Sequence, residues 1–357
     1  MLTAIEQAKK GLGFVSPNPP VGCVIVSANG EIIGLGYHKK IGDAHAEVNA
    51  LSQVKDKSLL KNATVYVTLE PCAHEGRTPS CAKNLAKLPI AEVVYGIIDP
   101  NPKVSGQGIK ILESAGIKTR KMVGLEVELN ALAEHFLINQ IMSTAFLTLK
   151  VAISLDGQIG LKNGDSKWIT SEESRKFSRK LRAHHDAVMV GAGTLLKDDP
   201  LLDLRDTEYS SKKQSLVIYD PKDRISTDQK NLKVFKSFDP DKIVFIKPIG
   251  AKESFNNIVF SDDFSFDKIK KNLYGRSIFS IYAEGGSYLH SMLLQQRAFD
   301  RLIIFIAPKI IGALNGKAWT SELGIDSLNQ AIELRELKTD SIMGDIVLTG
   351  SKSDRII

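Results

Sequence analysis

The pattern of hydrophobic and polar positions divides the chain into two α/β segments. Up to about Ile141, short apolar runs alternate with amphipathic stretches, as in a sheet covered by helices on both sides. A second α/β pattern begins at Ala145, where the apolar run 146–153 leads into the turn 154–157. We therefore place a boundary near Ser143 and predict two domains, residues 1–143 and 144–357.

In the first segment the pattern predicts a helix, a hairpin and then alternating helices and strands. Asn29-Gly30 joins the hairpin strands, because this dipeptide favours a two-residue turn. Asp43 is the expected N-cap of the second helix. The predicted helices are 2–11, 45–54, 81–88, 108–115 and 125–139, and the predicted strands are 21–27, 31–37, 64–69 and 92–98.

The second segment is predicted to alternate strands and helices in the same way. The predicted strands are 187–190, 215–219, 243–246, 278–283, 301–307 and 344–348, after the opening strand 146–153. Residues 207–264 are rich in Lys, Asp and Ser and have poor periodicity, so the pattern says least about this stretch.

Length and composition narrow the class of protein. The 357 residues exceed the roughly 250–300 at which single cores stop growing. No apolar run reaches the roughly 18 residues of a membrane span, and the first ten residues lack a secretory pattern, so we expect a cytoplasmic protein. The three cysteines are too few for a disulfide framework.

The net charge of +6 is spread along the chain and forms no basic stripe. We therefore expect no nucleic-acid or membrane partner. A basic surface also attracts anionic small molecules, which would suit a phosphorylated substrate. We expect the chain to form a homo-oligomer.

The strongest chemical signal is His45-Ala46-Glu47 combined with Pro71-Cys72 and Cys81. One imidazole and two thiolates leave the fourth tetrahedral position of Zn²⁺ open for water, which a hydrolytic deaminase requires. The reaction also needs a proton carrier that is not a ligand, and Glu47 has that chemistry. Residues two apart share no face inside a helix, so we expect His45 at a helix start and Glu47 in its first turn. A second helix start near the two cysteines would favour their thiolates.

Each of these residues also has a purely structural interpretation. His-x-Glu is common on helix surfaces, and a buried free cysteine packs as a small hydrophobe. Cys23, in an apolar strand outside the pattern, is expected only to pack. His45, Glu47 and the two cysteines together, in this order, favour a metal site.

The two cysteines are separated by eight residues, 73–80, where the general deaminase pattern has two. Such a loop would bring His74, Arg77, Thr78 and backbone amides to the metal, where they suit a phosphate or a polar ring. A solvated surface loop is the alternative.

Polar, glycine-bearing turns follow apolar strands in the second segment. They lie at 154–157, 191–194 and 198–200, and 283–287 joins a strand to a helix. Strand ends of an open α/β sheet form ligand crevices, and free amides at a helix start can bind a pyrophosphate. Since no Gly-x-Gly-x-x-Gly occurs there, the residues alone fit an ordinary tight turn equally well.

These motifs resemble a known bifunctional family. The motifs are 16–22 (SPNPPVG), 45–47, 71–81 (PCAHEGRTPSC), 99–102 (DPNP), 150–157 (KVAISLDG), 166–171 (SKWITS), 191–194 (GAGT), 198–200 (DDP) and 283–287 (AEGGS). They are similar to the two halves of the bifunctional riboflavin-biosynthesis deaminase/reductase. The resemblance covers nearly the whole chain and is weakest over residues 206–275.

The resemblance implies a cytidine-deaminase-like domain followed by a dihydrofolate-reductase-like domain. It implies zinc on His45, Cys72 and Cys81, with Glu47 as proton donor. The first domain would release ammonia from 2,5-diamino-6-ribosylamino-pyrimidinone 5′-phosphate. The second would then use NADPH to reduce the ribosyl group to ribityl.

The resemblance also implies a set of ligand contacts. In the deaminase, the expected substrate residues are Asn18, His74 and Arg77. In the reductase, the expected NADPH residues are Ala152, Trp168, Thr194, Asp198, Gly286, Ser287, Tyr288, Leu289, His290, Ser291 and Met292. The expected substrate residues of the reductase are Lys150, Ser166, Arg182, Leu202, Arg205 and Glu284.

Arg182 and Arg205 are the natural phosphate partners in this set, since a guanidinium matches phosphate oxygens in a bidentate way. Surface salt bridges are the alternative for both. Two positions depart from the family pattern. Asp203 stands where a small hydroxyl residue is usual, and Gln158 where a basic residue is frequent.

Two other functions fit parts of the pattern. A tRNA or nucleobase deaminase with an accessory nucleotide-binding domain would share His-x-Glu and Pro-Cys, but the long inter-cysteine loop and the missing basic stripe argue against it. A structural zinc module fused to a nucleotide sensor is the non-enzymatic alternative. Structural sites normally use four protein ligands, and the sequence offers three.

Overall fold

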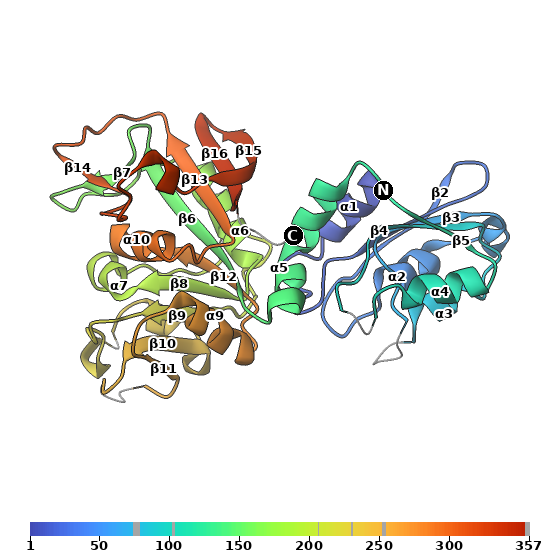
Figure 1. Cartoon of the computed structure of the whole chain (residues 1–357), viewed down its shortest axis with the longest axis horizontal. Helices are drawn as coiled ribbons and strands as arrows, with labels where there is room; N and C mark the ends of the chain where they lie inside the picture. Colours follow the sequence, from blue (N-terminus) through green and yellow to red (C-terminus); the bar gives the residue numbers. More distant parts are fainter. Residues whose placement is uncertain (74–78, 102–103, 206, 230, 252–254, 354–357) are drawn as a thin grey trace. The chain divides into compact units, whose positions relative to one another are not determined.

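The computed structural model describes residues 1–73, 79–101, 104–205, 207–229, 231–251 and 255–353. The chain divides into two compact units, one ending at Ser143 and the other beginning at Thr144 (Figure 1). Each unit is built around its own sheet. No helix in the described ranges is both long and apolar enough to cross a membrane.

The first unit contains a five-stranded sheet in the order β2-β1-β3-β4-β5. β1 pairs antiparallel with β2 and β3, whereas β3, β4 and β5 run parallel because helices connect them. The strands are β1 (Gly22–Val26), β2 (Ile32–Tyr37), β3 (Thr64–Leu69), β4 (Glu92–Ile97) and β5 (Lys118–Lys121).

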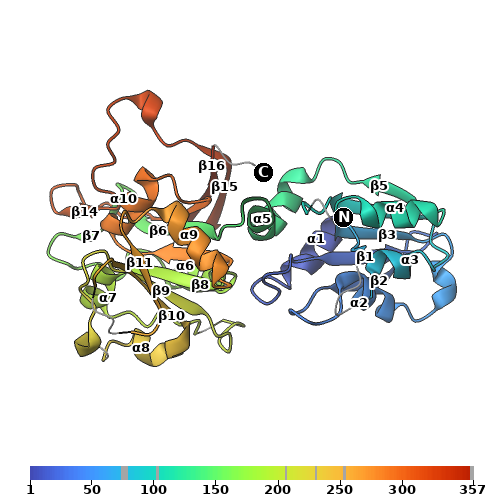
Figure 2. The same cartoon turned by 60° about the horizontal axis from the view of Figure 1, so that its bottom comes forward.

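Helices cover both faces of this sheet (Figure 2). They are α1 (Leu2–Lys9), α2 (Ala46–Gln53), α3 (Cys81–Leu85), α4 (Gln107–Ser114) and α5 (Glu126–Met142), with the short 3₁₀ turn η1 (Lys57–Leu60). Gly22 lets α1 approach one face, since a Cβ there would lie 1.9 Å from the Ala4 carbonyl oxygen. Gly36 does the same for α2, where a Cβ would lie 2.3 Å from the Ala46 carbonyl oxygen. This close packing fixes the start of α2 against the sheet.

The second unit contains a nine-stranded sheet in the order β11-β10-β9-β8-β12-β6-β13-β16-β15. The strands from β11 to β13 are parallel, and β16 is antiparallel to both its neighbours. The strands are β6 (Phe146–Ser154), β8 (Ala187–Gly191), β9 (Ser215–Tyr219), β10 (Ile243–Pro248), β11 (Ile258–Ser261), β12 (Ser280–Glu284), β13 (Arg301–Ala307), β15 (Leu334–Ile342) and β16 (Asp345–Lys352). A separate ribbon joins β7 (Gln158–Leu161) to β14 (Gly316–Ala318).

Alternate residues of β8 pack into different cores on the two faces of this sheet. Ala187 and Met189 join the core formed with α9 and α10, whereas Val188 and Val190 join the core formed with α7 and α8. The helices are α6 (Glu172–Ala183), α7 (Ala192–Asp198), α8 (Val234–Ser237), α9 (Phe266–Gly275) and α10 (Ser287–Gln295), with 3₁₀ turns η2 (Thr227–Gln229), η3 (Pro240–Lys242) and η4 (Leu328–Gln330). The predicted α/β architecture is confirmed.

Some local predictions were wrong. The N-cap of α2 is His45 rather than Asp43, because the backbone is extended at His45 and the Asn49 N–H donates to the His45 carbonyl. The sequence analysis missed β5, β7, β11, β14 and β15. β5 and β15 are largely polar edge strands, whose residues lack the apolar alternation on which strand prediction depends.

Candidate metal centre and cofactor pocket

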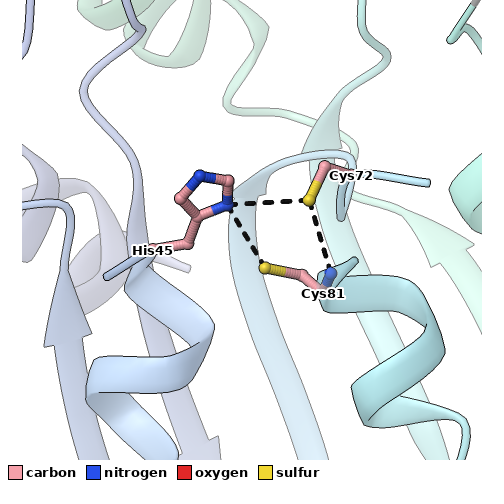
Figure 3. Close-up of side chains that lie close together, drawn as sticks. All are labelled: His45, Cys72 and Cys81. Atoms are coloured by element: carbon pink, nitrogen blue, oxygen red, sulfur yellow. Dashed lines mark hydrogen bonds between the residues drawn. The ribbon is translucent and has the colours of Figure 1, made fainter. Parts of the chain in front are cut away.

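Three side chains from three separate elements converge in the first unit (Figure 3). His45 precedes α2, Cys72 follows β3 by three residues, and Cys81 is the first residue of α3. His45 Nδ1 lies 3.6 Å from Cys72 Sγ and 3.3 Å from Cys81 Sγ. All three ligand atoms lie within 4.8 Å of one another.

The start of α3 holds the Cys72 sulfur in place. The Cys81 backbone N–H donates to Cys72 Sγ at 3.3 Å, and the Ser80 hydroxyl donates to the Cys72 carbonyl oxygen at 2.7 Å. Ser80 also caps α3, since its hydroxyl accepts from the Lys83 N–H at 3.2 Å. Hydrogen bonds from Cys81 and His45 lower the pKa of Cys72, and this favours its thiolate.

Glu47 lies in the first turn of α2 and is only 4% exposed. Burial raises its pKa, and its carboxyl interacts with the Cys81 thiol. A carboxyl with a raised pKa beside the cluster is suited to take up and release a proton.

His38 is a site residue that the sequence analysis did not identify. It follows β2, its ring lies 5.5 Å from the His45 ring, and its Nδ1 lies 3.2 Å from the Ala44 carbonyl oxygen. Asn18 Nδ2 lies 3.3 Å from His38 Nε2, so the exposed Asn18 is linked to the cluster through His38. The only sequence signal was the position of His38 at the end of a strand.

Buried Glu70, two residues before Cys72, holds the backbone of the segment that follows β4. Its carboxylate accepts backbone N–H groups from Asp99, Gly106 and Gly108 at 3.3, 3.0 and 3.0 Å. Gly108 must be small, because a Cβ there would lie 1.9 Å from the Pro71 carbonyl oxygen. The predicted substrate residues His74 and Arg77 lie outside the described residues.

One imidazole and two thiols at these distances match the donor set of a catalytic zinc site with one open position. Cys23 is fully buried in the core of the sheet and is not one of the cluster residues in the described part of the unit. Burial raises its pKa, which fits packing alone.

The second unit has a pocket of about 620 Å³ where its parallel strands end. Gly191, Tyr219 and Glu284 line it from the carboxyl ends of β8, β9 and β12. The predicted ligand residues that line it are Lys150, Ala152, Ser166, Trp168, Thr194, Asp198, Leu202, Glu284, Gly286, Ser287, Tyr288 and Leu289. The strand-to-helix turn 284–287 thus lies on the pocket wall, at the start of α10.

Five predicted ligand residues are outside this lining: Arg182, Arg205, His290, Ser291 and Met292. His290 Nδ1 lies 3.0 Å from the Trp319 carbonyl oxygen, and Ser291 accepts from the Ser321 backbone N–H at 2.7 Å. Arg205 Nε lies 2.7 Å from Asp203 Oδ1. Arg205, a predicted phosphate partner, therefore forms an ion pair with Asp203, the residue that departs from the family pattern.

Arg182 contacts the pocket indirectly. It donates to Glu284 Oε1 at 2.6 Å and to the Asp203 carbonyl oxygen at 2.9 Å. Lys150 Nζ lies 4.0 Å from the other carboxylate oxygen of Glu284. Burial would raise the pKa of Glu284, but Arg182 and Lys150 outweigh it and lower that pKa. Glu284 therefore presents an ionised carboxylate at the pocket wall at neutral pH.

Most of the charge in the pocket comes from residues that the sequence analysis missed. The newly found cations are Lys167, Arg175, Lys197, Lys222, Arg224 and Lys317. They come from a strand, two helices and loops that are far apart in the sequence, and the sequence analysis assigned none of them to a ligand. The Arg175 guanidinium stacks 4.2 Å from the centre of the Trp168 ring, which is 62% exposed.

Comparison with known families matches both units. Residues 1–97 match the cytidine and deoxycytidylate deaminase zinc-binding region, and residues 145–348 match the RibD C-terminal domain. The second match alone spans more than half of the chain.

Full-length relatives carry both parts. A riboflavin biosynthesis protein RibD of Aquifex aeolicus is 39% identical over 98% of this chain and 96% of its own length. RibD of Escherichia coli K12 is 32% identical over 98% and 97%. The crystal structure of a diaminohydroxyphosphoribosylaminopyrimidine deaminase/5-amino-6-(5-phosphoribosylamino)uracil reductase from Thermotoga maritima has a TM-score of 0.85 and 36% identity, covering 99% of this chain and 97% of that one.

Proposed function

Because this chain belongs to the RibD family of riboflavin biosynthesis proteins, we propose that it is a cytoplasmic bifunctional enzyme with a zinc-dependent deaminase in residues 1–143 and an NADPH-dependent reductase in residues 144–357. The first domain releases ammonia from the 2,5-diaminopyrimidine ribonucleotide 5′-phosphate. The second reduces the ribosyl group of the product to ribityl.

In the deaminase, His45, Cys72 and Cys81 hold the metal, and the geometry of their three donor atoms supports this role. Zinc bound there would lower the pKa of a water ligand, so that hydroxide is available to attack the amino-bearing ring carbon. Glu47 accepts the proton of that water and passes it to the departing amino group, which leaves as ammonia. The position of Glu47 beside Cys81 and its raised pKa support this assignment.

In the same site, the Cys81 N–H keeps the Cys72 sulfur directed at the metal position. His38 orients Asn18 toward the substrate side of the cluster. Asn18, His74 and Arg77 bind the nucleotide in this proposal.

In the reductase, the pocket at the strand ends binds both nucleotides. NADPH supplies the hydride for the ribosyl carbon. Gly286 and Ser287 leave backbone amides free at the start of α10, which suits the pyrophosphate of the cofactor. Lys150 and Glu284, whose charged groups lie 4.0 Å apart in the pocket wall, bind the polar ribosyl end of the substrate.

The cofactor contacts in this proposal also include Ala152, Trp168, Thr194, Asp198, Tyr288 and Leu289, which line the pocket, and His290, Ser291 and Met292, which act through the body of α10. The substrate contacts include Ser166 and Leu202. Arg182 and Arg205 contribute through Glu284 and Asp203, the residues they pair with.

The convergence of His45, Cys72 and Cys81 beside Glu47 is the observation that carries the proposal. The test is to incubate the pure chain with the diaminopyrimidine nucleotide and to follow ammonia before NADPH is added. We expect one ammonia per nucleotide without NADPH, and NADPH oxidation only once deaminated product is present. NADPH oxidation that needs no prior ammonia release would contradict the order of the two steps.

A tRNA deaminase is not favoured, because residues 145–348 match the RibD C-terminal domain. Homo-oligomer formation stays a prediction, and light scattering of the purified chain tests it.

A further inference from the structure

The segment of residues 166–170, which precedes α6, forms part of the wall of the pocket in the second unit. All of its residues line the pocket, and Ser166 and Trp168 are two of the proposed ligand contacts. Trp168 is 62% exposed, so packing against the core does not fix its ring. A free side chain loses entropy when a ligand orders it, so a ligand binds more tightly to a ring that the protein already holds.

Two side chains from the sheet region fix the backbone of the 166–170 segment. Lys309, which follows β13, donates from Nζ to the Trp168 carbonyl oxygen at 2.8 Å. Directly after the segment, the Ser171 N–H donates to the carboxylate of buried Asp345 at 2.7 Å. These two contacts hold the main chain, and neither involves the indole ring of Trp168.

Arg175, in the first turn of α6, holds the ring itself. The central carbon of its guanidinium lies 4.2 Å from the centre of the Trp168 ring, and its Nη1 donates to the Thr170 carbonyl oxygen at 2.7 Å. A guanidinium is planar, so its face stacks on an aromatic ring while its edge donates hydrogen bonds. Arg175 thus connects the ring of Trp168 to the backbone of the same segment.

The Arg175 guanidinium forms no ion pair with a carboxylate within the described ranges of the chain. Arg182 of the same helix differs in this respect, since it pairs with Glu284. The Trp168 ring is therefore the main partner of the Arg175 cation. Because the guanidinium covers one face of the indole, the opposite face and the ring edges are left to contact a ligand.

We propose that Arg175 is a positioning residue of the reductase, which fixes the Trp168 ring as a preformed contact surface for NADPH. This inference rests on the proposed function, in which Trp168 contacts the cofactor. Arg175 acts through Trp168 and does not itself bind the nucleotide. Its loss therefore weakens the binding of NADPH and leaves the hydride transfer step unchanged.

The first test compares NADPH binding to the wild-type chain and to Arg175→Ala by calorimetry. We expect affinity to fall roughly 3- to 30-fold, since part of the free energy of the lost cation–π contact and hydrogen bond appears as weaker binding. In steady-state assays the KM for NADPH should rise by a similar factor, with kcat at saturating NADPH within about twofold of wild type.

Lys176→Ala is the matched control, because it removes the next cation of α6, which is exposed and outside the pocket lining. It should leave both the affinity and the KM for NADPH at their wild-type values. A loss of kcat with an unchanged KM in Arg175→Ala would indicate general damage to the fold and would overturn the positioning role.

A double-mutant cycle decides whether Arg175 acts through Trp168. In the Trp168→Ala background, the further change Arg175→Ala should alter the affinity by less than about twofold, because the ring that Arg175 holds is already absent. An equal loss in both backgrounds would overturn the positioning role and make Arg175 a direct contact of the cofactor. A wild-type chain that binds no NADPH would instead refute the proposed reductase.

The fluorescence of Trp168 gives a readout that needs no nucleotide. The chain has two tryptophans, Trp168 and Trp319, so the variant Trp319→Phe reports on Trp168 alone. In that background Arg175→Ala should lower the fluorescence anisotropy, because the released ring moves more freely. Arg175→Lys, which keeps the charge but not the planar group, is the second variant in case the alanine variant does not fold. Wild-type anisotropy in the folded variants would overturn the positioning role.

Discussion

The backbone N–H of Cys81 donates to the sulfur of Cys72 across 3.3 Å, so one proposed ligand holds the other. Ser80, the residue before Cys81, supports the same contact, because its hydroxyl donates to the Cys72 carbonyl oxygen at 2.7 Å. Since Cys81 opens α3, the positive end of the helix also favours a thiolate at Cys72.

Cys72→Ser should abolish zinc binding and ammonia release, because a hydroxyl is a poor zinc ligand beside one imidazole and one thiolate. Reduction of supplied deaminated intermediate should persist. Metal analysis and the two separate assays check this. Cys23→Ala, at a buried cysteine outside the cluster, is the control and should keep one zinc per chain. Full zinc occupancy in the serine variant would remove Cys72 from the ligand set.

Glu47→Gln should leave zinc bound and slow ammonia release by at least about 100-fold, since general acid–base catalysis contributes ~10²–10⁴. The amide keeps the size of the side chain but cannot carry the proton. Glu6→Gln, on the exposed face of α1, is the control. Near wild-type deamination by the glutamine variant would show that another group moves the proton.

Gly286→Val should weaken NADPH binding by roughly tenfold or more, equivalent to about 1.4 kcal/mol. Gly286 has an extended backbone, and a Cβ there would meet nothing closer than 3.8 Å in the protein. The added side chain therefore has room in the free protein and obstructs only a close ligand. Gly275→Ala, where a Cβ meets nothing within 4 Å, is the control. Equal cofactor affinity in both variants would argue against a phosphate site at this turn.

Arg182→Met should destabilise the second unit by about 3 kcal/mol, because it takes the closest cation away from the Glu284 carboxylate, whose side chain is only 16% exposed. The pH dependence follows from the lowered pKa of Glu284. The stabilisation by ionised Glu284 is fully present above its ordinary value of 4.5 and is lost as pH falls through its lower folded pKa.

Glu284→Gln removes this pH dependence and serves as the companion variant. Denaturant unfolding at pH 7 and at pH 4 should show the stability difference between wild type and Glu284→Gln narrowing at the lower pH. A difference that widens on acidification would mean that the carboxylate is destabilising.

The metal cluster was predictable because its residues lie in short sequence motifs. His45 and Glu47 are two residues apart, and their place at a helix start follows from helix geometry. His38 escaped prediction because a single histidine at a strand end carries no pattern, and its role depends on the hairpin folding back onto α2.

The pocket of the second unit was predictable only in part. Its glycine turns lie at strand ends, where the rules for α/β sheets place ligands. Its cations, such as Lys222 and Lys317, are about a hundred residues apart in the sequence, and only the fold brings them to one pocket. Arg182 has the chemistry of a phosphate partner, but in the fold it forms an ion pair with Glu284. The sequence pattern does not reveal this pairing.

Each unit of the chain has its own sheet and core, and within the described ranges each site draws its side chains from one unit only. We therefore expect each proposed activity to survive in a polypeptide cut between residues 143 and 144. The fusion would then add equal production of both activities.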